Sequence, residues 1–256
     1  MKKITVIVFM LAAHILTDGF ACDLTVRVPD RGSYPPFFIQ NENNGKWSGL
    51  SIELVEALLK EAGCTPSYKP LPFKRALLYL GTGEIDIVLN LSIKKEREKY
   101  TNFIGPQLDE TVVLVVRKDS NYELNSLDDI KKLPKAIGIE KGKYYGKAFK
   151  DKRKNDKEFD KRIDGTDNFI FNERKLRKKH ISGFLGYGYN VFARFKKNPM
   201  YKNFKVHSLV VQKDWVYFGL SKKSVSGDML QKLQKAYDRA TKKGTFKEVQ
   251  NRYRVD

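Results

Sequence analysis

The segment "LPFKRALLYLGTGEIDIVLNLSIKKEREKYTNF", residues 71–103, places a predicted helix directly before a predicted buried strand. Its apolar residues recur at helical spacing from Phe73 through Leu80, which predicts a helix. The apolar run "EIDIVLNL", residues 84–91, is typical of a strand in the core of a sheet. A helix and a strand in this order form part of the alternation that predicts a parallel α/β sheet.

The residues before this segment show the same alternation. "LTVRVPD" (24–30) predicts a strand, "GSYPPFFI" (32–39) a proline-stiffened loop, and "TPSYKPLP" (65–72) a second strand. Between them, "GKWSGLSIELVEALLKEAGC" (45–64) has apolar residues at helical spacing and predicts a helix that stops at Gly63.

The resulting β-α-β-α-β order predicts a parallel sheet with helices on both faces and right-handed crossovers. Ligands bind outside the carboxyl ends of the strands in such sheets. We therefore expect a binding site in the loops after Asp30, Pro72 and Leu91.

From residue 111 the pattern of strands and helices starts again. "NSLDDIKKL" (125–133) has Ser126 placed to cap a short helix, with Asp129 three residues on. Further strands and helices follow, and the chain ends in two helices separated at Gly244. The sequence therefore predicts a second α/β unit, and two lobes connected by strands.

The first 21 residues predict a secretory signal peptide. "MKKITVIVFMLAAHILTDGFAC" has two lysines, a short apolar run, and small residues at the first and third places before Cys22. An uncleaved anchor is the alternative, but the run is short for a bilayer span and His14 and Asp18 interrupt it. We expect cleavage after Ala21, and an exported mature chain.

Cys22 and Cys64 are the only two cysteines of the chain. Export implies an oxidising compartment, so one disulfide between them is the default expectation. They begin the first and second predicted strands, which start on the same edge of a parallel sheet, so the bridge is geometrically reasonable. Acylation of Cys22, as in a lipoprotein, is the alternative, although the residues before it do not fit a lipoprotein signal.

The chain is strongly basic, with a formal net charge of +19 at pH 7. Residues 131–205 hold 23 Lys and Arg against 8 Asp and Glu, which is a net of +15. Such a field attracts anions, whether acidic solutes, lipid headgroups or nucleic acid. A solvated lysine-rich surface is the reading we favour, and export without a recognition motif argues against nucleic acid.

Four segments, in this order and spacing, resemble the family 3 bacterial extracellular solute-binding proteins, which deliver polar amino acids to ABC transporters. The segments are "PPFFI…NGKWSGLSIELVEALLKEAG", "LPFKRALLYLGTGEIDIVLNLSIKKEREKYTNF", "NSLDDIKKL" and "LQKLQKAYDRATKKGTFKEVQNRY".

The resemblance implies a type II periplasmic-binding-protein fold, with two α/β lobes joined by two hinge strands and a ligand cleft between the lobes. Lobe one would comprise residues 23–110 plus 212–256, and the basic lobe two residues 112–208. The hinges are expected near Asp109 to Val113 and near Ser208 to Lys213.

The resemblance also assigns roles to residues. In the family a Thr-x-x-x-x-Arg motif, at the end of the third strand and the start of the following helix, clamps the ligand carboxylate. Ser92 and Arg97 take its two positions here. A guanidinium suits a carboxylate because its planar N–H donors pair bidentately with it. An exposed Arg97 paired with Glu96 or Glu98 is the alternative. The remaining matches are Phe73 over the ligand side chain, Asp30 and Tyr34 after strand one, and Asn90 near the ammonium.

Lobe two departs from the family pattern at two places. Tyr144 and Tyr145 replace small residues of an anion-binding loop, and Tyr187 stands where an aspartate normally faces the ligand ammonium. A buried ammonium without a countercharge is costly. We therefore expect a carboxylate-bearing ligand with an apolar, aromatic or modified remainder, and list Tyr144 and Tyr187 among its contacts.

The resemblance implies a periplasmic receptor of an ABC importer, not an enzyme, with a small-molecule ligand and a membrane permease as partners. A monomer is expected. An exported sensor module and a dehydratase-like enzyme, with Glu140 as its one acid candidate, remain the alternatives. No cofactor is expected, and no metal, because no His, Cys or carboxylate cluster has ligand spacing.

Overall fold

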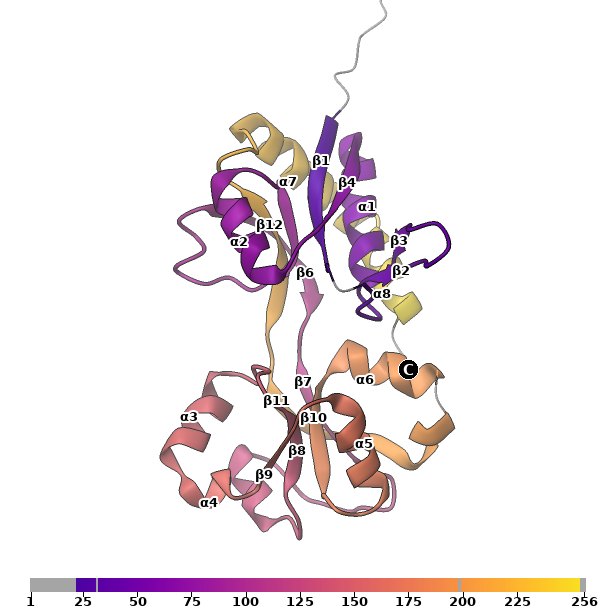
Figure 1. The fold of residues 1–256 in the computed structure, drawn as a ribbon, viewed down its shortest axis with the longest axis vertical. Coiled ribbons are helices and arrows are strands. Elements are labelled where there is room, and N and C mark those ends of the chain that lie inside the picture. The colour runs from indigo at the N-terminus through magenta and orange to yellow at the C-terminus, as the bar shows by residue number, and fades with distance from the viewer. Residues whose placement is uncertain (1–21, 31, 198, 254–256) are drawn as a thin grey trace, which may run out of the picture.

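The computed structural model describes residues 22–30, 32–197 and 199–253, so the expected signal peptide, residues 1–21, lies outside the described part. Two α/β lobes lie one above the other and are joined by two extended segments (Figure 1). Each lobe is built on its own five-stranded sheet. The expected two-lobed α/β architecture is confirmed.

In the sheet of lobe one, four strands run in the same direction and β12 alone runs opposite to them. β1 pairs in parallel with β4 and β5, whereas β12 runs antiparallel to both β5 and β6. In sheet order the strands are β4 (Cys64–Pro70), β1 (Cys22–Val28), β5 (Ile87–Leu91), β12 (Trp215–Ser221) and β6 (Thr101–Asp109).

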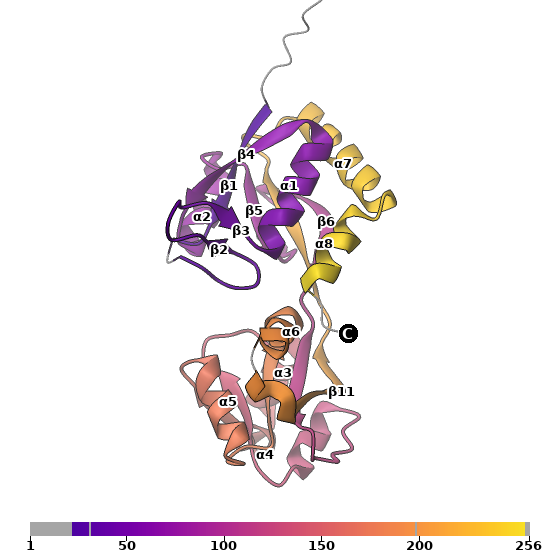
Figure 2. The same cartoon turned by 90° about the vertical axis from the view of Figure 1, so that its right-hand side faces the viewer.

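Helices cover both faces of this sheet. α1, α7 and α8 lie together against one side of lobe one, where they enclose its largest core (Figure 2). A smaller core under α2 includes Leu80, Ile85 and Val88. The bounds are α1 (Leu50–Ala62), α2 (Phe73–Thr82), α7 (Gly227–Lys242) and α8 (Thr245–Tyr253), with a small hairpin of β2 (Ile39–Gln40) and β3 (Trp47–Ser48) before α1.

Two details expected from the sequence are confirmed in lobe one. α1 ends at Gly63, which has a left-handed conformation with φ of 65° and satisfies the last helical carbonyl groups. Cys22 lies directly opposite Cys64 in the parallel register of β1 and β4, and the two form a disulfide. The disulfide therefore holds the two strands together at the edge where both begin.

Lobe two has a sheet in the order β11, β7, β10, β8, β9, with a hydrophobic core on each face. Its strands are β7 (Val112–Arg117), β8 (Ile137–Glu140), β9 (Ile163–Thr166), β10 (Gly183–Tyr187) and β11 (Phe204–Gln212). Its helices are η1 (Leu127–Lys132), α3 (Lys147–Asn155), α4 (Lys157–Asp160), α5 (Phe169–Arg177), α6 (Gly188–Lys197) and η2 (Pro199–Asn203). The helix expected after Ser126 is present as the 3-10 helix η1, with both hydrogen bonds of its capping box formed by Ser126 and Asp129.

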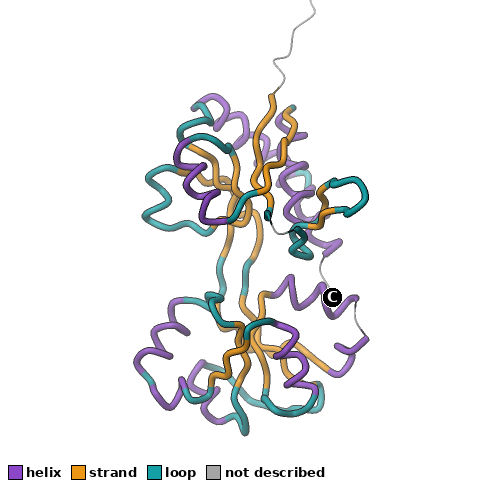
Figure 3. The backbone as a smooth tube through the Cα atoms, viewed as in Figure 1, coloured by secondary structure: helices purple, strands orange, loops and turns teal. Residues whose placement is uncertain are grey.

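The two crossings between the lobes lie next to each other. One runs from β6 to β7 and the other from β11 to β12, so that strands approach the narrow waist from both sides (Figure 3). β11 pairs with β7 as far as Gln212, so the second crossing comes at residues 212–215. Across the waist, the N–H of Glu110 donates to the carbonyl of Asp214 over 2.9 Å. Among the described residues, none of the helices has the length and apolar character that crossing a membrane would need.

Candidate functional site

A cavity of about 480 Å³ lies between the lobes at the waist. It is lined from lobe one, from the first crossing and from lobe two, and most of its polar residues follow the carboxyl ends of strands, as expected for parallel α/β sheets. A neighbouring hollow of about 290 Å³ extends over lobe two and shares four of the lining residues. The shared residues are Tyr34, Lys143, Tyr187 and Asn190.

Two arginines flank the aromatic ring of Phe73. This residue begins α2, is 40% exposed and lines the cavity. The guanidinium carbon of Arg27 lies 5.7 Å from the ring centroid and that of Arg97 lies 5.9 Å from it. Partial burial lowers the pKa of both arginines, although a guanidinium keeps its charge at any physiological pH. The ring and the two guanidinium groups thus form one cluster at Phe73.

Each of these arginines is held by a backbone carbonyl. Nε of Arg27 donates to Leu71 over 2.9 Å, and Nη1 of Arg97 donates to the carbonyl of Ser92 over 2.9 Å. Ser92 thus contacts Arg97 through its backbone, and its half-buried hydroxyl makes no hydrogen bond within the described residues. Within the described residues, neither guanidinium makes a further hydrogen bond or an ion pair.

The expectation of a helix directly after the third strand is wrong. β5 ends at Leu91, and the chain then forms a turn in which the N–H groups of Arg97 and Glu98 donate to Lys94. Most side chains of this charged segment are exposed, so it offers no apolar face to hold a longer helix against the lobe. Arg97 is therefore positioned by a turn and by its bond to Ser92.

Asn90 has an uncommon backbone conformation for a residue other than glycine, with φ of 56°. Its side-chain oxygen accepts a hydrogen bond from Ser51, and its N–H donates to the side chain of Gln107, each over 2.9 Å. Asn90 lines the cavity, and such conformations often occur at ligand sites.

The tyrosines of lobe two form a stacked pair behind the cavity. Tyr187 lines the cavity, stacks on Tyr145 with ring centroids 6.3 Å apart, and donates its hydroxyl to the carbonyl of Tyr144 over 2.6 Å. Burial raises the pKa of Tyr145 to about 12, and it also raises the pKa of Tyr187, so both stay neutral. The side chain of Tyr144 is exposed and lines neither hollow.

The structure thus brings Phe73, Asn90, Tyr34 and Tyr187 together on one cavity. Arg97 reaches the same place through its contact with Phe73, whereas Asp30 is exposed and outside the lining residues, close enough to Arg27 to interact with its charge.

Five polar residues of the cavity were not expected from the sequence, namely Arg27, Ser33, Glu110, Lys143 and Asn190. Arg27 alternates with the buried Val26 and Val28 in β1, so strand periodicity could have placed it on the opposite face. Glu110 has no sequence signal beyond its position between two strands.

One side of the waist holds direct contacts between the lobes. Asn190 of α6 donates its side-chain amide to the carbonyl of Pro35 over 2.9 Å. Its neighbour Tyr189 is buried against Phe37, with ring centroids 6.3 Å apart, and packs into the core of lobe one. The start of α6 therefore contributes to both lobes. In the described ranges, His, Cys, Asp and Glu side chains do not gather into a group that could hold a metal ion.

Two α/β lobes, two adjacent crossings and a polar cavity between the lobes define a solute-binding receptor of the type II periplasmic class. The chain belongs to the bacterial extracellular solute-binding proteins, family 3, whose family model matches residues 26–256. The expected family, and the expected role of a solute-binding receptor, are thereby confirmed.

Individual proteins show the same likeness. The chain is 26% identical to the "Probable amino-acid-binding protein YxeM" of Bacillus subtilis, over 99% of this chain and 95% of that protein. It is 32% identical to the L-cystine-binding protein TcyJ of Escherichia coli K12, over 47% of this chain and 45% of TcyJ. The crystal structure of the probable amino-acid ABC transporter extracellular-binding protein ytmK from Bacillus subtilis superposes with a TM-score of 0.72, at 19% identity, over 92% of this chain and 100% of that one.

Proposed function

We propose that this chain is the exported receptor of an ABC importer and that it captures a small carboxylate-bearing solute by closing its lobes. The observation that supports this most directly is the pair of guanidinium groups at Phe73, beside a cavity of about 480 Å³. A cavity of this volume suits a ligand the size of an amino acid.

The ligand class is argued from charge. Arg27 lines one end of the cavity and Arg97 lies at the same Phe73 ring. These two cations favour a carboxylate, which accepts paired N–H donors from a guanidinium. The exposed ring of Phe73 and the buried Phe37 give the same cavity apolar walls. Full-length similarity to a protein named as amino-acid-binding supports an amino acid or a compound like one.

The further assignments follow from the same site. Arg97 and Arg27 would bind the carboxylate, Phe73 and Tyr187 would cover the remainder of the ligand, and Asn90 would offer polar backbone groups. A membrane permease would receive the solute from a monomeric, periplasmic receptor. We propose binding without catalysis. The one acid candidate, Glu140, lies outside the main cavity, in the smaller hollow, where its carboxylate is 3.8 Å from the ammonium of Lys143.

Isothermal titration calorimetry tests the carboxylate clamp. The ligand panel is the twenty standard L-amino acids, L-cystine and small dicarboxylic acids, tested against the wild type, Arg97→Ala and Arg27→Ala. Loss of a charge-assisted hydrogen bond of about 1.5–3 kcal/mol predicts about a ten- to hundredfold weaker affinity for the best ligand.

Arg75→Ala is the matched control, because Arg75 lies on the same helix as Phe73 and its side chain is exposed outside the cavity lining. We expect it to bind like the wild type. Equal affinity of the wild type and both cavity variants would contradict the clamp.

A further inference from the structure

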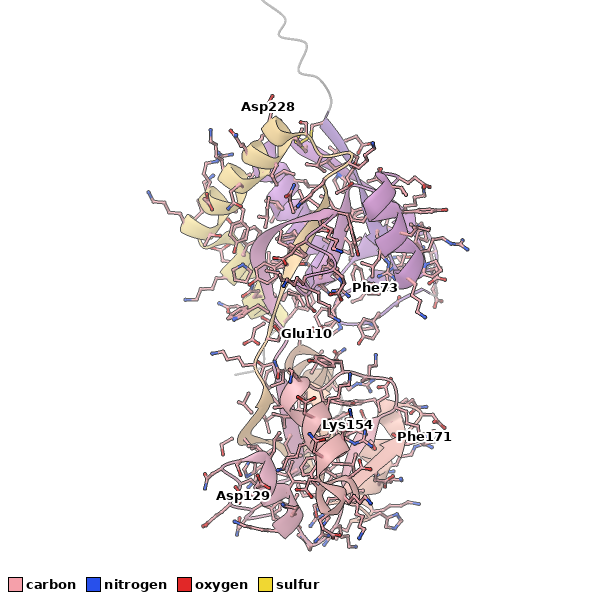
Figure 4. The ribbon with its side chains drawn as sticks, turned by 90° about the vertical axis from the view of Figure 1, so that its left-hand side faces the viewer. Phe73, Glu110, Asp129, Lys154, Phe171 and Asp228 are labelled. Carbon is pink, nitrogen blue, oxygen red and sulfur yellow. A yellow bond between two sulfur atoms is a disulfide. The ribbon has the colours of Figure 1, made fainter. Side chains whose placement is uncertain are left out.

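Glu110 places a carboxyl group in the cavity from the waist of the molecule. It lies between β6 and β7 and is labelled at the waist in Figure 4, below Phe73 of lobe one. It lines the main cavity and also a narrow gap behind it that Asn90 and Tyr187 share. Glu110 therefore reaches the same cavity as Arg27, from a different element.

The two neighbouring carboxylates each accept a hydrogen bond from a backbone N–H group of the crossings. Asp109 accepts the N–H of Thr111 over 2.8 Å, and Asp214 accepts the N–H of Trp215 over 2.8 Å. Over the described ranges, the carboxyl group of Glu110 has neither a hydrogen bond nor an ion pair. Among the described carboxylates of the waist, Glu110 is thus the one that lines the main cavity and whose carboxyl group has no hydrogen-bond or ion-pair partner of its own.

The charged and titratable groups around Glu110 come from three segments other than the first crossing, on which Glu110 lies. Asp214 on the second crossing repels a negative charge on it, whereas Lys143 in the loop after β8 stabilises one. Tyr187 on β10 faces it as a neutral phenol whose hydroxyl is bonded to a carbonyl. Burial, followed by Asp214, raises the pKa of Glu110 to about 7. Burial makes the ionised form of this carboxyl group costly, so a cation placed beside it stabilises that charged form strongly.

We propose that Glu110 is the countercharge for a cationic nitrogen of the ligand. In lobe two, Tyr187 stands where the family has an acid for this role, and Glu110 would supply the negative charge from the waist instead. This inference rests on the proposed function, since it takes the cavity to be the ligand site. The ligand is then a zwitterion or a cationic amino acid, with its carboxylate toward Arg27 and Arg97 and its ammonium toward Glu110. The sequence indicated that lobe two has no countercharge for a ligand ammonium, and Glu110 would provide one from outside that lobe.

Proton release on binding is a consequence of this arrangement. At pH 7 the carboxyl group of the empty receptor is partly protonated, and a bound ammonium lowers its pKa. The proton therefore passes from Glu110 to the buffer as the ligand binds. Affinity for the ammonium-bearing ligand should rise from pH 6 to pH 8, because less of the receptor must lose a proton first.

The experiment is calorimetry on the full mature chain with the best binder among the twenty standard L-amino acids and L-cystine. Wild type, Glu110→Gln and the control Asp109→Asn are compared in phosphate and in Tris, which differ greatly in ionisation enthalpy. We expect the binding enthalpy of the wild type and of Asp109→Asn to differ between buffers. Glu110→Gln should lose this difference and bind about ten- to hundredfold more weakly.

A second arm uses the des-amino analogue of the same ligand, which keeps the carboxylate and lacks the ammonium. Its affinity should be equal or higher for Glu110→Gln than for the wild type. If the wild type binds an amino acid but Glu110→Gln keeps the same affinity and buffer dependence, the inference is overturned and the proposed function stands. If neither the amino acids nor the analogues bind the wild type, the proposed function itself fails.

Discussion

At the scale of single residues, the cavity combines groups of opposite charge that come from separate parts of the chain. Arg27 precedes the end of β1, Arg97 lies in the turn after β5, and Glu110 lies in the first crossing. Phe73 links the two arginines through its ring. Each of these side chains is partly shielded from water, so its interaction with a ligand is stronger than that of the many exposed lysines.

Glu110 should make the stability of the protein depend on pH. Its folded-state pKa, about 7, lies above its usual value of 4.5, so the folded state binds the proton more tightly than the unfolded state does. The free energy of unfolding should fall as the pH rises from about 4.5 to just above 7 and then level off. Glu110→Gln should remove this decrease, which amounts to at most about 3 kcal/mol.

Urea denaturation of both proteins across this pH range, without ligand, measures the effect. The difference in unfolding free energy between Glu110→Gln and the wild type should grow in favour of the variant as the pH rises. Parallel pH profiles would show that Glu110 titrates normally in the folded state.

At the scale of the elements, the local signals that rest on periodicity and turn chemistry match the structure. α1 begins and ends where its apolar spacing and Gly63 predict, and Ser126 begins the short helix η1. The helix expected after Leu91 is absent, because its charged residues give it nothing to pack against. Local propensity is therefore reliable in these elements only where an apolar face accompanies it.

The disulfide joins two strand beginnings 42 residues apart in the chain, which lie opposite each other in the parallel pair of β1 and β4. Closing a loop of this length restricts the unfolded chain, so Cys22→Ser with Cys64→Ser should lower the free energy of unfolding by about 2–4 kcal/mol. Guanidinium chloride denaturation of the double variant measures the loss.

The control for this prediction is the wild type unfolded with a reducing agent present, which should match the double variant unfolded without it. An unchanged free energy of unfolding would mean that the α1 core and the strand pairing hold this edge of lobe one without the bridge.

At the scale of the whole molecule, the two lobes have separate cores and touch at few places. Contacts between the lobes include the hydrogen bond from Asn190 to Pro35, the packing of Tyr189 on Phe37 and the ammonium of Lys143 over the ring of Tyr34. Two short crossings with separate cores on either side are the usual basis of hinge motion. The start of α6 is a place where lobe two contacts lobe one directly.

Ligand binding should bring the lobes closer together, and small-angle X-ray scattering measures the change as a decrease in the radius of gyration. The expected ligand is the tightest binder found by calorimetry, at a concentration that saturates the wild type. Arg97→Ala at the same ligand concentration serves as the control and should keep the radius of its empty form. A saturated wild type with an unchanged radius would show that binding occurs without closure.

The sequence by itself determined the family, the alternation of strands and helices, the partners of the disulfide and part of the cavity lining, namely the residues after Asp30 and Pro72. These features depend on residue type and spacing along the chain, which determine which faces are apolar and where helices stop. The loops after Asp30, Pro72 and Leu91 could be chosen because parallel strands direct their carboxyl ends to one edge.

Only the tertiary structure decided which side chains share the cavity and which charges are shielded from water. Arg27 and Glu110 are 83 positions apart in the printed sequence, and no local pattern relates them. They line one cavity because the sheet brings β1 and β6 to the waist from the same lobe. The pKa of Glu110 is likewise set by burial and by Asp214 on the other crossing, since electrostatic interactions depend on distance and burial in the folded molecule.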